Sequence, residues 1–175
     1  MFFLEELPDT RMLKGFAERF PEMEIDATAA CLRLLRVASR LIRSLEAHFS
    51  RHGLSQARFL VLVVLERTAE KHLMPVEIAK QMGISKKNTA RLLNFMEDDK
   101  LIRRTSHDTD GRASVITATP KGRSLLDKAL PGYYRVLNAA MSPLAAKERR
   151  AFIEILDLIG PDEVPQRKAG GTASS

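Results

Sequence analysis

Two short amphipathic segments separated by three residues constrain this chain more than any other feature of its sequence. Residues 75–82 and 86–98 place apolar side chains at helical spacing, and the link between them is Gly-Ile-Ser. Glycine commonly ends a helix and serine commonly caps the next one, while Pro75 suits a first helical turn. The sequence therefore predicts two short helices joined by a tight turn.

The second of these predicted helices has two chemically different sides. At about 100° per residue, one side holds Thr89, Leu92, Leu93 and Met96, and the opposite side holds Lys87, Arg91 and Asn94. The apolar side predicts anchoring to a core, with Ser85 as the N-cap. Lysine and arginine donate hydrogen bonds to base edges in the major groove of DNA, and asparagine pairs with adenine. The polar side therefore indicates a surface for DNA.

A β-hairpin is predicted directly after these helices. The runs LIRRT and ASVITAT flank a polar centre that contains Gly111, which is a hairpin pattern. A hairpin after a helix-turn-helix is the winged variant of this DNA-binding arrangement. Residues 86–123 hold nine lysines and arginines against five acids, which is +4 of the net +6. This charge favours a polyanionic partner, and Arg112 at the predicted tip is a candidate for the minor groove.

Longer helical patterns flank this region on both sides. They cover residues 9–20, residues 25–49, a segment capped by Ser55, a segment that starts at Pro120 after Thr119, and a segment from about Pro143. Pro131 and Gly132 are expected to kink or split the helix that starts at Pro120. The apolar face of 25–49 is too wide for one neighbour, which predicts contact with a second chain. The predicted fold class is mostly α with a small β-hairpin wing.

Length and composition limit the organisation of the chain. With 175 residues, 45% of them hydrophobic, we predict a single domain over residues 1–175. Its predicted parts are dimerisation helices at 1–53 and 124–160, a winged helix-turn-helix at 54–123 and a disordered tail at 161–175. The first residues meet acids too early for a signal peptide, and no apolar run is long enough to span a bilayer. We therefore expect a cytoplasmic protein.

The central segments also resemble a known family. The stretches LMPVEIAKQMGISKKNTARLLNFMEDDKLIRR and DTDGRASVITATPKGRSLL resemble the MarR family of bacterial transcriptional regulators, most specifically in DGRA and TPKG. The resemblance implies a winged helix-turn-helix homodimer, most often a repressor, that binds pseudo-palindromic DNA. It also implies release by a small-molecule effector, for which an aromatic or lipophilic ligand is expected. The expected DNA-binding residues are Ser85, Lys86, Lys87, Asn88, Ala90, Arg91, Asn94 and Arg112.

Three residues depart from the pattern of the family. Ala90 stands where a hydroxyl side chain is usual, so an apolar contact with a thymine methyl is an alternative. Phe95 stands where a polar residue is common, and our hypothesis is that it packs under the wing. Met74 replaces a capping hydroxyl, which is expected to cost its helix about 1 kcal/mol.

Other chemistry has weaker support in the sequence. Cys31 is the single cysteine; we interpret it as buried and inert, with redox sensing as the alternative. His48 and His52 lie one helical turn apart, a spacing that can chelate a metal, but interaction with the end of their own helix is the favoured interpretation.

No metal, cofactor or enzymatic activity is predicted, because the sequence has no phosphate-binding glycine loop, nucleophile elbow or HExxH motif. A winged-helix module for protein or RNA contacts is the competing class. Strong salt dependence without sequence discrimination would indicate such a module.

Overall fold

The computed structural model describes residues 6–106 and 114–159. The chain divides into two compact units, Met1–Leu137 and Asn138–Ser175, and each is considered by itself. None of the helices in the described part of the chain is both long and apolar enough to span a membrane.

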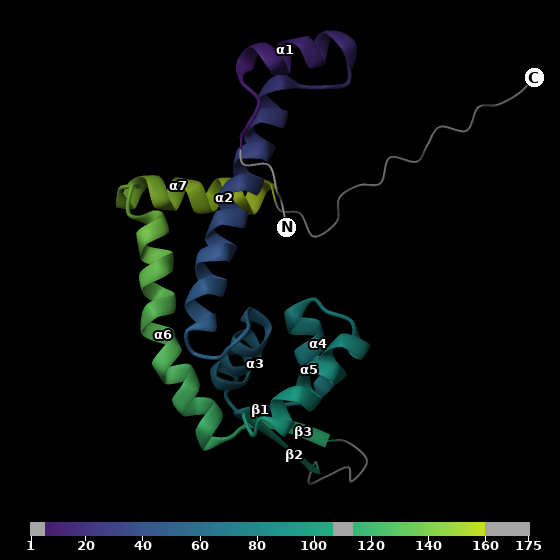
Figure 1. Ribbon diagram of the computed structural model, residues 1–175, viewed down its shortest axis with the longest axis vertical. Coiled ribbons are helices and arrows are strands. Elements are labelled where there is room, and N and C mark those ends of the chain that lie inside the picture. The colour runs from purple at the N-terminus through teal and green to yellow at the C-terminus, as the bar shows by residue number, and fades with distance from the viewer. Residues whose placement is uncertain (1–5, 107–113, 160–175) are drawn as a thin grey trace, which may run out of the picture. The chain divides into compact units, whose positions relative to one another are not determined.

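The first unit begins with two helices of very different length (Figure 1). Helix α1 spans Thr10–Arg19, and the carboxylate of its N-cap Asp9 accepts a hydrogen bond from the Met12 amide at 2.8 Å. Helix α2 spans Ile25–Ser50. Both ranges agree with the sequence-based prediction to within one residue.

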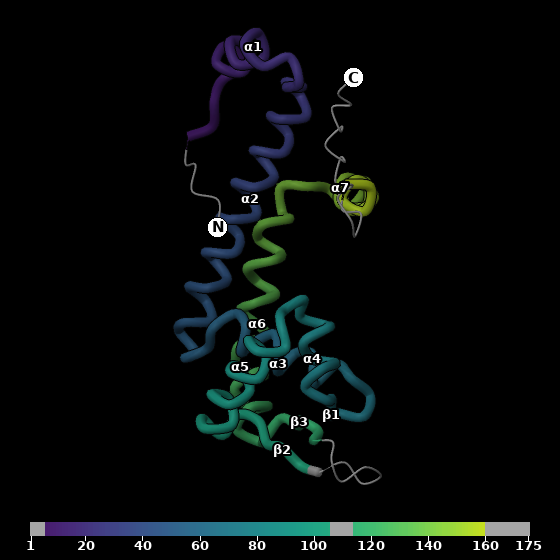
Figure 2. Tube along the Cα trace, turned by 90° about the vertical axis from the view of Figure 1, so that its right-hand side faces the viewer, coloured from purple at the N-terminus to yellow at the C-terminus, as the bar shows by residue number. Residues whose placement is uncertain are grey.

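Helix α2 meets the rest of the unit mainly through its C-terminal half. Leu45 and Phe49 are buried there, whereas apolar side chains nearer its start are exposed, among them Leu34, Leu35 and Val37. Figures 1 and 2 both place α1 at the end of α2 that is remote from the core. The prediction that the apolar face of α2 is too wide for its own unit is therefore confirmed, because part of that face stays exposed.

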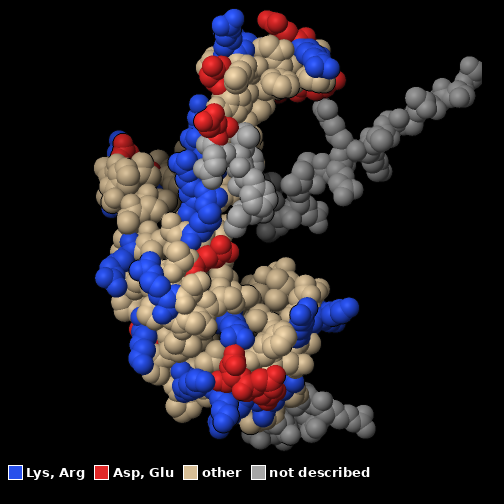
Figure 3. All heavy atoms as spheres, in the orientation of Figure 1, with Lys and Arg blue, Asp and Glu red and all other residues tan. Residues whose placement is uncertain are grey.

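Basic side chains also line α2. Arg33, Arg36, Arg40 and Arg43 recur every three or four residues along it, and Figure 3 shows the resulting stripe of Lys and Arg atoms. The helix holds four arginines against the two acids Asp26 and Glu46. Positive charge on this protein is thus not confined to the predicted DNA surface.

Helix α3, Gln56–Arg67, forms the centre of the core. The Ser55 hydroxyl caps it by accepting from the Arg58 amide at 3.3 Å. Phe59 is fully buried and stacks on Phe49 of α2 with ring centroids 4.4 Å apart. An apolar surface nearly all round suits a helix with neighbours on every side.

A small antiparallel sheet in the order β1-β3-β2 closes one side of this core. Strand β1 is His72–Leu73, β2 is Ile102–Ser106 and β3 is Ser114–Ala118. The predicted hairpin is confirmed by the pairing of β2 with β3. The sequence analysis missed β1, because its two residues lie in a polar break and become a strand only by pairing with Thr117 and Ile116.

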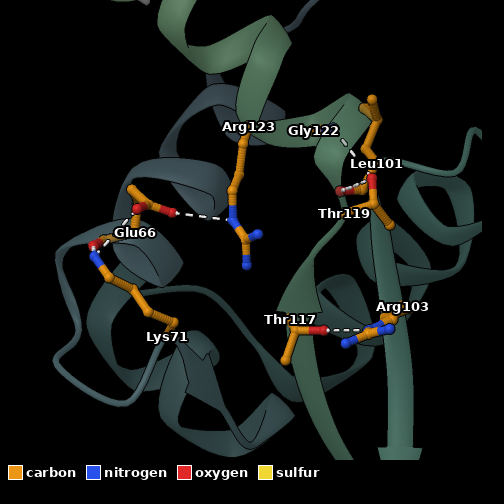
Figure 4. Close-up of polar contacts among 8 residues, drawn as sticks. All are labelled: Glu66, Lys71, Leu101, Arg103, Thr117, Thr119, Gly122 and Arg123. Carbon is orange, nitrogen blue, oxygen red and sulfur yellow. Dashed lines mark hydrogen bonds and ion pairs between the residues drawn. The ribbon is translucent and has the colours of Figure 1, made fainter.

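Helix α6, Pro120–Met141, begins at a close contact with the strand side of the core. The Thr119 hydroxyl donates to the Lys100 carbonyl at 2.7 Å. It also accepts from the Gly122 amide at 3.1 Å (Figure 4). A methyl group on Gly122 would overlap the backbone carbonyl of Leu101. The TPKG motif therefore supplies a helix cap, Thr119, and a glycine, Gly122, whose missing Cβ lets α6 lie against the Leu101 carbonyl.

The middle of α6 packs against the end of α2. The helix runs through Pro131, so the predicted split is wrong, whereas the predicted kink stays a prediction. His48 is buried, and its Nε2 is 2.8 Å from the Ala129 carbonyl of α6, so it does not serve the end of its own helix. Gly132 leaves space for the imidazole, because any Cβ there would overlap the ring.

The second unit contributes helix α7, Ala146–Ile159. It starts three residues later than predicted, and the Glu148 carboxylate caps it by accepting from the Ala145 amide at 2.6 Å. The structure records no buried side chain on this helix, although it carries several isoleucines and leucines.

Replacing Gly122 by alanine is expected to lower the free energy of unfolding by about 1–3 kcal/mol, because the neighbouring atom is backbone and cannot rotate away. Gly15→Ala in α1 is the matched control, since nothing lies within 4 Å of its added methyl. That variant should be neutral or stabilised by about 0.5–1 kcal/mol. Chemical denaturation of both variants measures the difference, and equal stabilities would contradict the packing argument.

Candidate nucleic-acid interface

The two predicted short helices and their turn are confirmed. Helix α4 spans Pro75–Met82 and helix α5 spans Lys86–Asp98. Gly83 between them has φ 63° and ψ 30°, the left-handed conformation that glycine adopts most easily. The Ser85 hydroxyl then caps α5 by accepting from the Asn88 amide at 3.3 Å. Gly83 and Ser85 thus have the roles that the sequence predicts.

The start of α4 is capped without a hydroxyl side chain. The Met74 amide donates to the Glu77 carboxylate at 2.7 Å, which is the half of a capping box that the N3 residue supplies. The contact offsets part of the cost expected from Met74. An acid in the first turn also interacts favourably with the helix dipole.

Helix α5 is oriented as its two sides predict. Thr89, Leu93 and Met96 are buried, and the latter two belong to the same apolar cluster as Phe59 of α3. The expected DNA-binding residues within the described chain are all exposed: Ser85, Lys86, Lys87, Asn88, Ala90, Arg91 and Asn94. Arg112 lies outside the described residues, as do Asp108, Asp110 and Gly111. The cationic surface of α5 therefore faces outward from a fixed base.

The wing strand β2 is tied to α5 by a residue that the sequence analysis did not single out. Arg104 donates from Nη2 to the Asn94 side-chain oxygen at 2.6 Å, and its Nε lies 3.4 Å from the Glu97 carboxylate. The Arg104 amide also donates to Glu97 at 3.2 Å. Because β2 is an edge strand, this last bond satisfies a donor on the open edge of the sheet. One arginine thus fixes the wing strand against the exposed helix.

The other flank of α5 holds an exposed aromatic residue. Phe95 is 48% exposed, and the Arg91 guanidinium carbon lies 5.6 Å from its ring centroid. Our expectation that Phe95 packs under the wing is therefore wrong for the described residues. The reason is angular: the wing strand is tied to Asn94 and Glu97, and Phe95 projects from a different side of the helix.

The C-terminal end of α5 is held by two further contacts. Arg58 of α3 forms an ion pair with the Asp99 carboxylate at 2.7 Å. Lys121 of α6 donates to the Asp99 carbonyl at 2.8 Å, where a cation is favoured near a helix C-terminus. Both ends of α5 are therefore fixed.

Several cations of the basic segment have partners within the protein. Figure 4 shows Arg103 donating to Thr117 across the hairpin at 3.1 Å, and Arg123 beside Glu66 at 3.6 Å, with Lys71 on the other side of that carboxylate. The positive charge counted from the sequence therefore overstates what is free for a partner. In the described part of the chain, no ion pair involves Lys86, Lys87 or Arg91.

The cysteine and the histidines have other surroundings than the sequence indicated. Cys31 is exposed, so its interpretation as a buried residue is wrong; it lies in the half of α2 that the core does not cover. His48 and His52 have ring centroids 5.0 Å apart. Among the residues that the structure describes, no group of three or more His, Cys, Asp or Glu is placed to hold a metal ion.

Taken together, α4, the turn, α5 and the sheet define a winged helix-turn-helix protein. Residues 52–113 match the sequence model of the MarR family. The chain is 26% identical over 153 residues to the HTH-type transcriptional repressor YetL of Bacillus subtilis, a match that covers 87% of this chain and 92% of YetL. Residues 52–113, which contain α4, α5 and the strands β1 and β2, are therefore similar to the MarR family.

Solved structures of the family have the same fold. AbsC, a MarR family transcriptional regulator from Streptomyces coelicolor, superposes with a TM-score of 0.74 at 21% identity, covering 79% of this chain and 94% of AbsC. Sco3205, a MarR family regulator from the same organism solved in complex with DNA, superposes with a TM-score of 0.73 at 19% identity over 79% and 88% of the two chains.

A double-mutant cycle tests the contact between α5 and the wing strand. Asn94→Ala and Arg104→Ala are expected to be coupled by about 0.5–1 kcal/mol in the free energy of unfolding, because each removes the same hydrogen bond. Asn88→Ala is the matched control: it makes the same substitution on the same helix, and its effect should add to that of Arg104→Ala. Additivity of the Asn94 pair would show that the contact contributes nothing to stability.

Proposed function

We propose that this protein is a sequence-specific DNA-binding transcriptional regulator that acts as a repressor. The observation that supports this function best is the exposed cationic side of α5 on a helix whose opposite side, both ends and neighbouring wing strand are fixed. Such preorganisation lowers the cost of placing side chains in a groove. The naming of YetL as a repressor and the DNA complex of Sco3205 support the same function.

In the proposed complex, α5 enters the major groove. Lys87 and Arg91 project toward the base edges, while Ser85, Lys86 and Asn88 lie at the start of the helix, where phosphate contacts are favoured. Ala90 offers a methyl group to a thymine methyl.

The proposed contacts of Asn94 and Arg112 differ from those of the other residues. The Asn94 side-chain oxygen is engaged by Arg104, so the amide nitrogen is the group that this residue offers to DNA. Arg112 stays a prediction for the minor groove, on the strength of its position beside Gly111 in the sequence.

Pseudo-palindromic recognition requires a second copy of the chain. We propose a homodimer that places two α5 helices about one helical turn of DNA apart. Exposed apolar side chains support it: on α2 they include Leu34, Leu35 and Val37, and Leu158 of α7 is 83% exposed. Large exposed apolar residues on two helices indicate an interface.

The similarity to the MarR family supports regulation by a small effector, for which we propose an aromatic or lipophilic molecule. A second candidate function is redox control through Cys31. Its thiol is exposed and not buried as the sequence suggested, and an exposed thiol is accessible to oxidants. No enzymatic role is proposed, because the relatives are named as transcription regulators.

Genomic footprinting of the purified protein is the direct test of the proposed function. We expect a small set of protected pseudo-palindromes. Binding to all DNA with a steep salt dependence and no sequence preference would instead support a general nucleic-acid or protein-contact module.

Arg91→Ala is expected to weaken binding to a footprinted site by about 1–3 kcal/mol and to relax base preference at one position of each half-site. The measurement is titration of the variant against site variants at one fixed salt concentration. An equal loss on every sequence would show that Arg91 contacts phosphate only.

Leu156→Lys in α7 is expected to raise the dissociation constant of the dimer more than tenfold, because burying a leucine contributes about 1.5–3 kcal/mol. Glu154→Lys puts the same side chain about half a turn away on the helix and serves as the control. Sedimentation velocity over a range of concentrations measures both. Equal dissociation constants for the two variants would remove this face of α7 from the proposed interface.

A further inference from the structure

The pairing of Arg91 with Phe95 carries an inference that rests on the proposed function and deepens it. We infer that Phe95 is a positioning residue, which holds the Arg91 guanidinium on its ring and thereby sets a preference for guanine at one base pair of each half-site.

The geometry places the two side chains together on the exposed part of α5. Arg91 and Phe95 are four residues apart, so they project from successive turns of the same helix. The guanidinium carbon lies 5.6 Å from the ring centroid, within the distance of about 6 Å at which a cation is attracted to an aromatic face. Both residues are exposed, and this contact therefore forms at the surface that the proposed function assigns to DNA.

The surroundings leave the ring as the support for Arg91. No ion pair in the described part of the chain includes Arg91. Glu97, an acid on the same helix, is engaged with both the amide and the side chain of Arg104. A carboxylate partner would compete with DNA for the guanidinium, whereas an aromatic face leaves the N–H groups at its edge unpaired.

The exposure of Phe95 is itself unusual on this helix. The other large apolar side chains of α5 face the core: Leu93 and Met96 are fully buried and Leu92 is half-buried. Phe95 at 48% exposure contributes little to that core. A large aromatic residue at a polar surface is therefore better explained by a contact made there than by folding.

This arrangement predicts a particular base. Arginine binds guanine bidentately through O6 and N7, and the pairing requires the planar guanidinium to be oriented. Contact with the Phe95 ring restricts the rotamers of an arginine side chain that otherwise has many. Because Phe95 carries no charge, its effect should appear in discrimination between bases and not in the salt dependence of binding.

The experiment compares Phe95→Leu and Phe95→Tyr in the full chain, on a footprinted site with all four base pairs at each position. We expect Phe95→Leu to reduce the preference for guanine at the Arg91 position about two- to fivefold. Phe95→Tyr should retain that preference, because it keeps the aromatic face. The slope of affinity against salt should be the same for both variants and the parent protein.

A second arm repeats Phe95→Leu in the Arg91→Ala background. If Phe95 acts through Arg91, the leucine substitution should have no further effect on base preference there. A continued effect would mean that Phe95 touches DNA directly, and would overturn the inference. Thermal unfolding of each variant checks that the fold is intact, as the exposure of Phe95 leads us to expect.

The outcomes separate this inference from the proposed function. A guanine preference that is equal in the parent protein and Phe95→Leu, or a uniform loss on all sequences, overturns only the role of Phe95. A parent protein without preference for any sequence overturns the proposed function and, with it, the inference.

Discussion

Burial of one side of α5 is the constraint on which the rest of the structure depends. Leu93 and Met96 join the apolar cluster around Phe59, so the helix cannot turn without exposing them to water. Full burial of such side chains contributes about 1.5–3 kcal/mol each. Because the polar residues of α5 lie opposite these anchors, fixing the apolar side also fixes the direction in which Lys87 and Arg91 project.

The polar contacts around α5 add precision to this anchoring. Asp99 is held by Arg58 at the end of the helix, and Arg104 ties the wing strand to Asn94 and Glu97. Exposed ion pairs contribute only about 0.2–1 kcal/mol each to stability. Their consequence is geometric, since two DNA-facing elements that are bonded to each other can meet a duplex at a constant spacing.

Much of the fold followed from local sequence patterns. The caps at Ser55 and Ser85 and the glycine turn at Gly83 depend on neighbouring residues, and they lie where the sequence predicted them. The misses depend on distant partners: β1 exists by pairing with β3, and His48 bonds to α6. Cys31 was misplaced because free cysteine is commonly buried, and the residue type does not say which part of the helix the core covers.

The sequence by itself determined the order of the helices, the turn and the two sides of α5, because capping and helical periodicity act over only a few residues. Only the tertiary structure decided which surface cations have a partner within the protein and which are left for DNA. Arg103, Arg104 and Arg123 look like Arg91 in the sequence, yet the first three have partners within the protein. These hydrogen bonds and ion pairs join residues on different helices and strands, and the charge pattern of a sequence does not encode which contacts form.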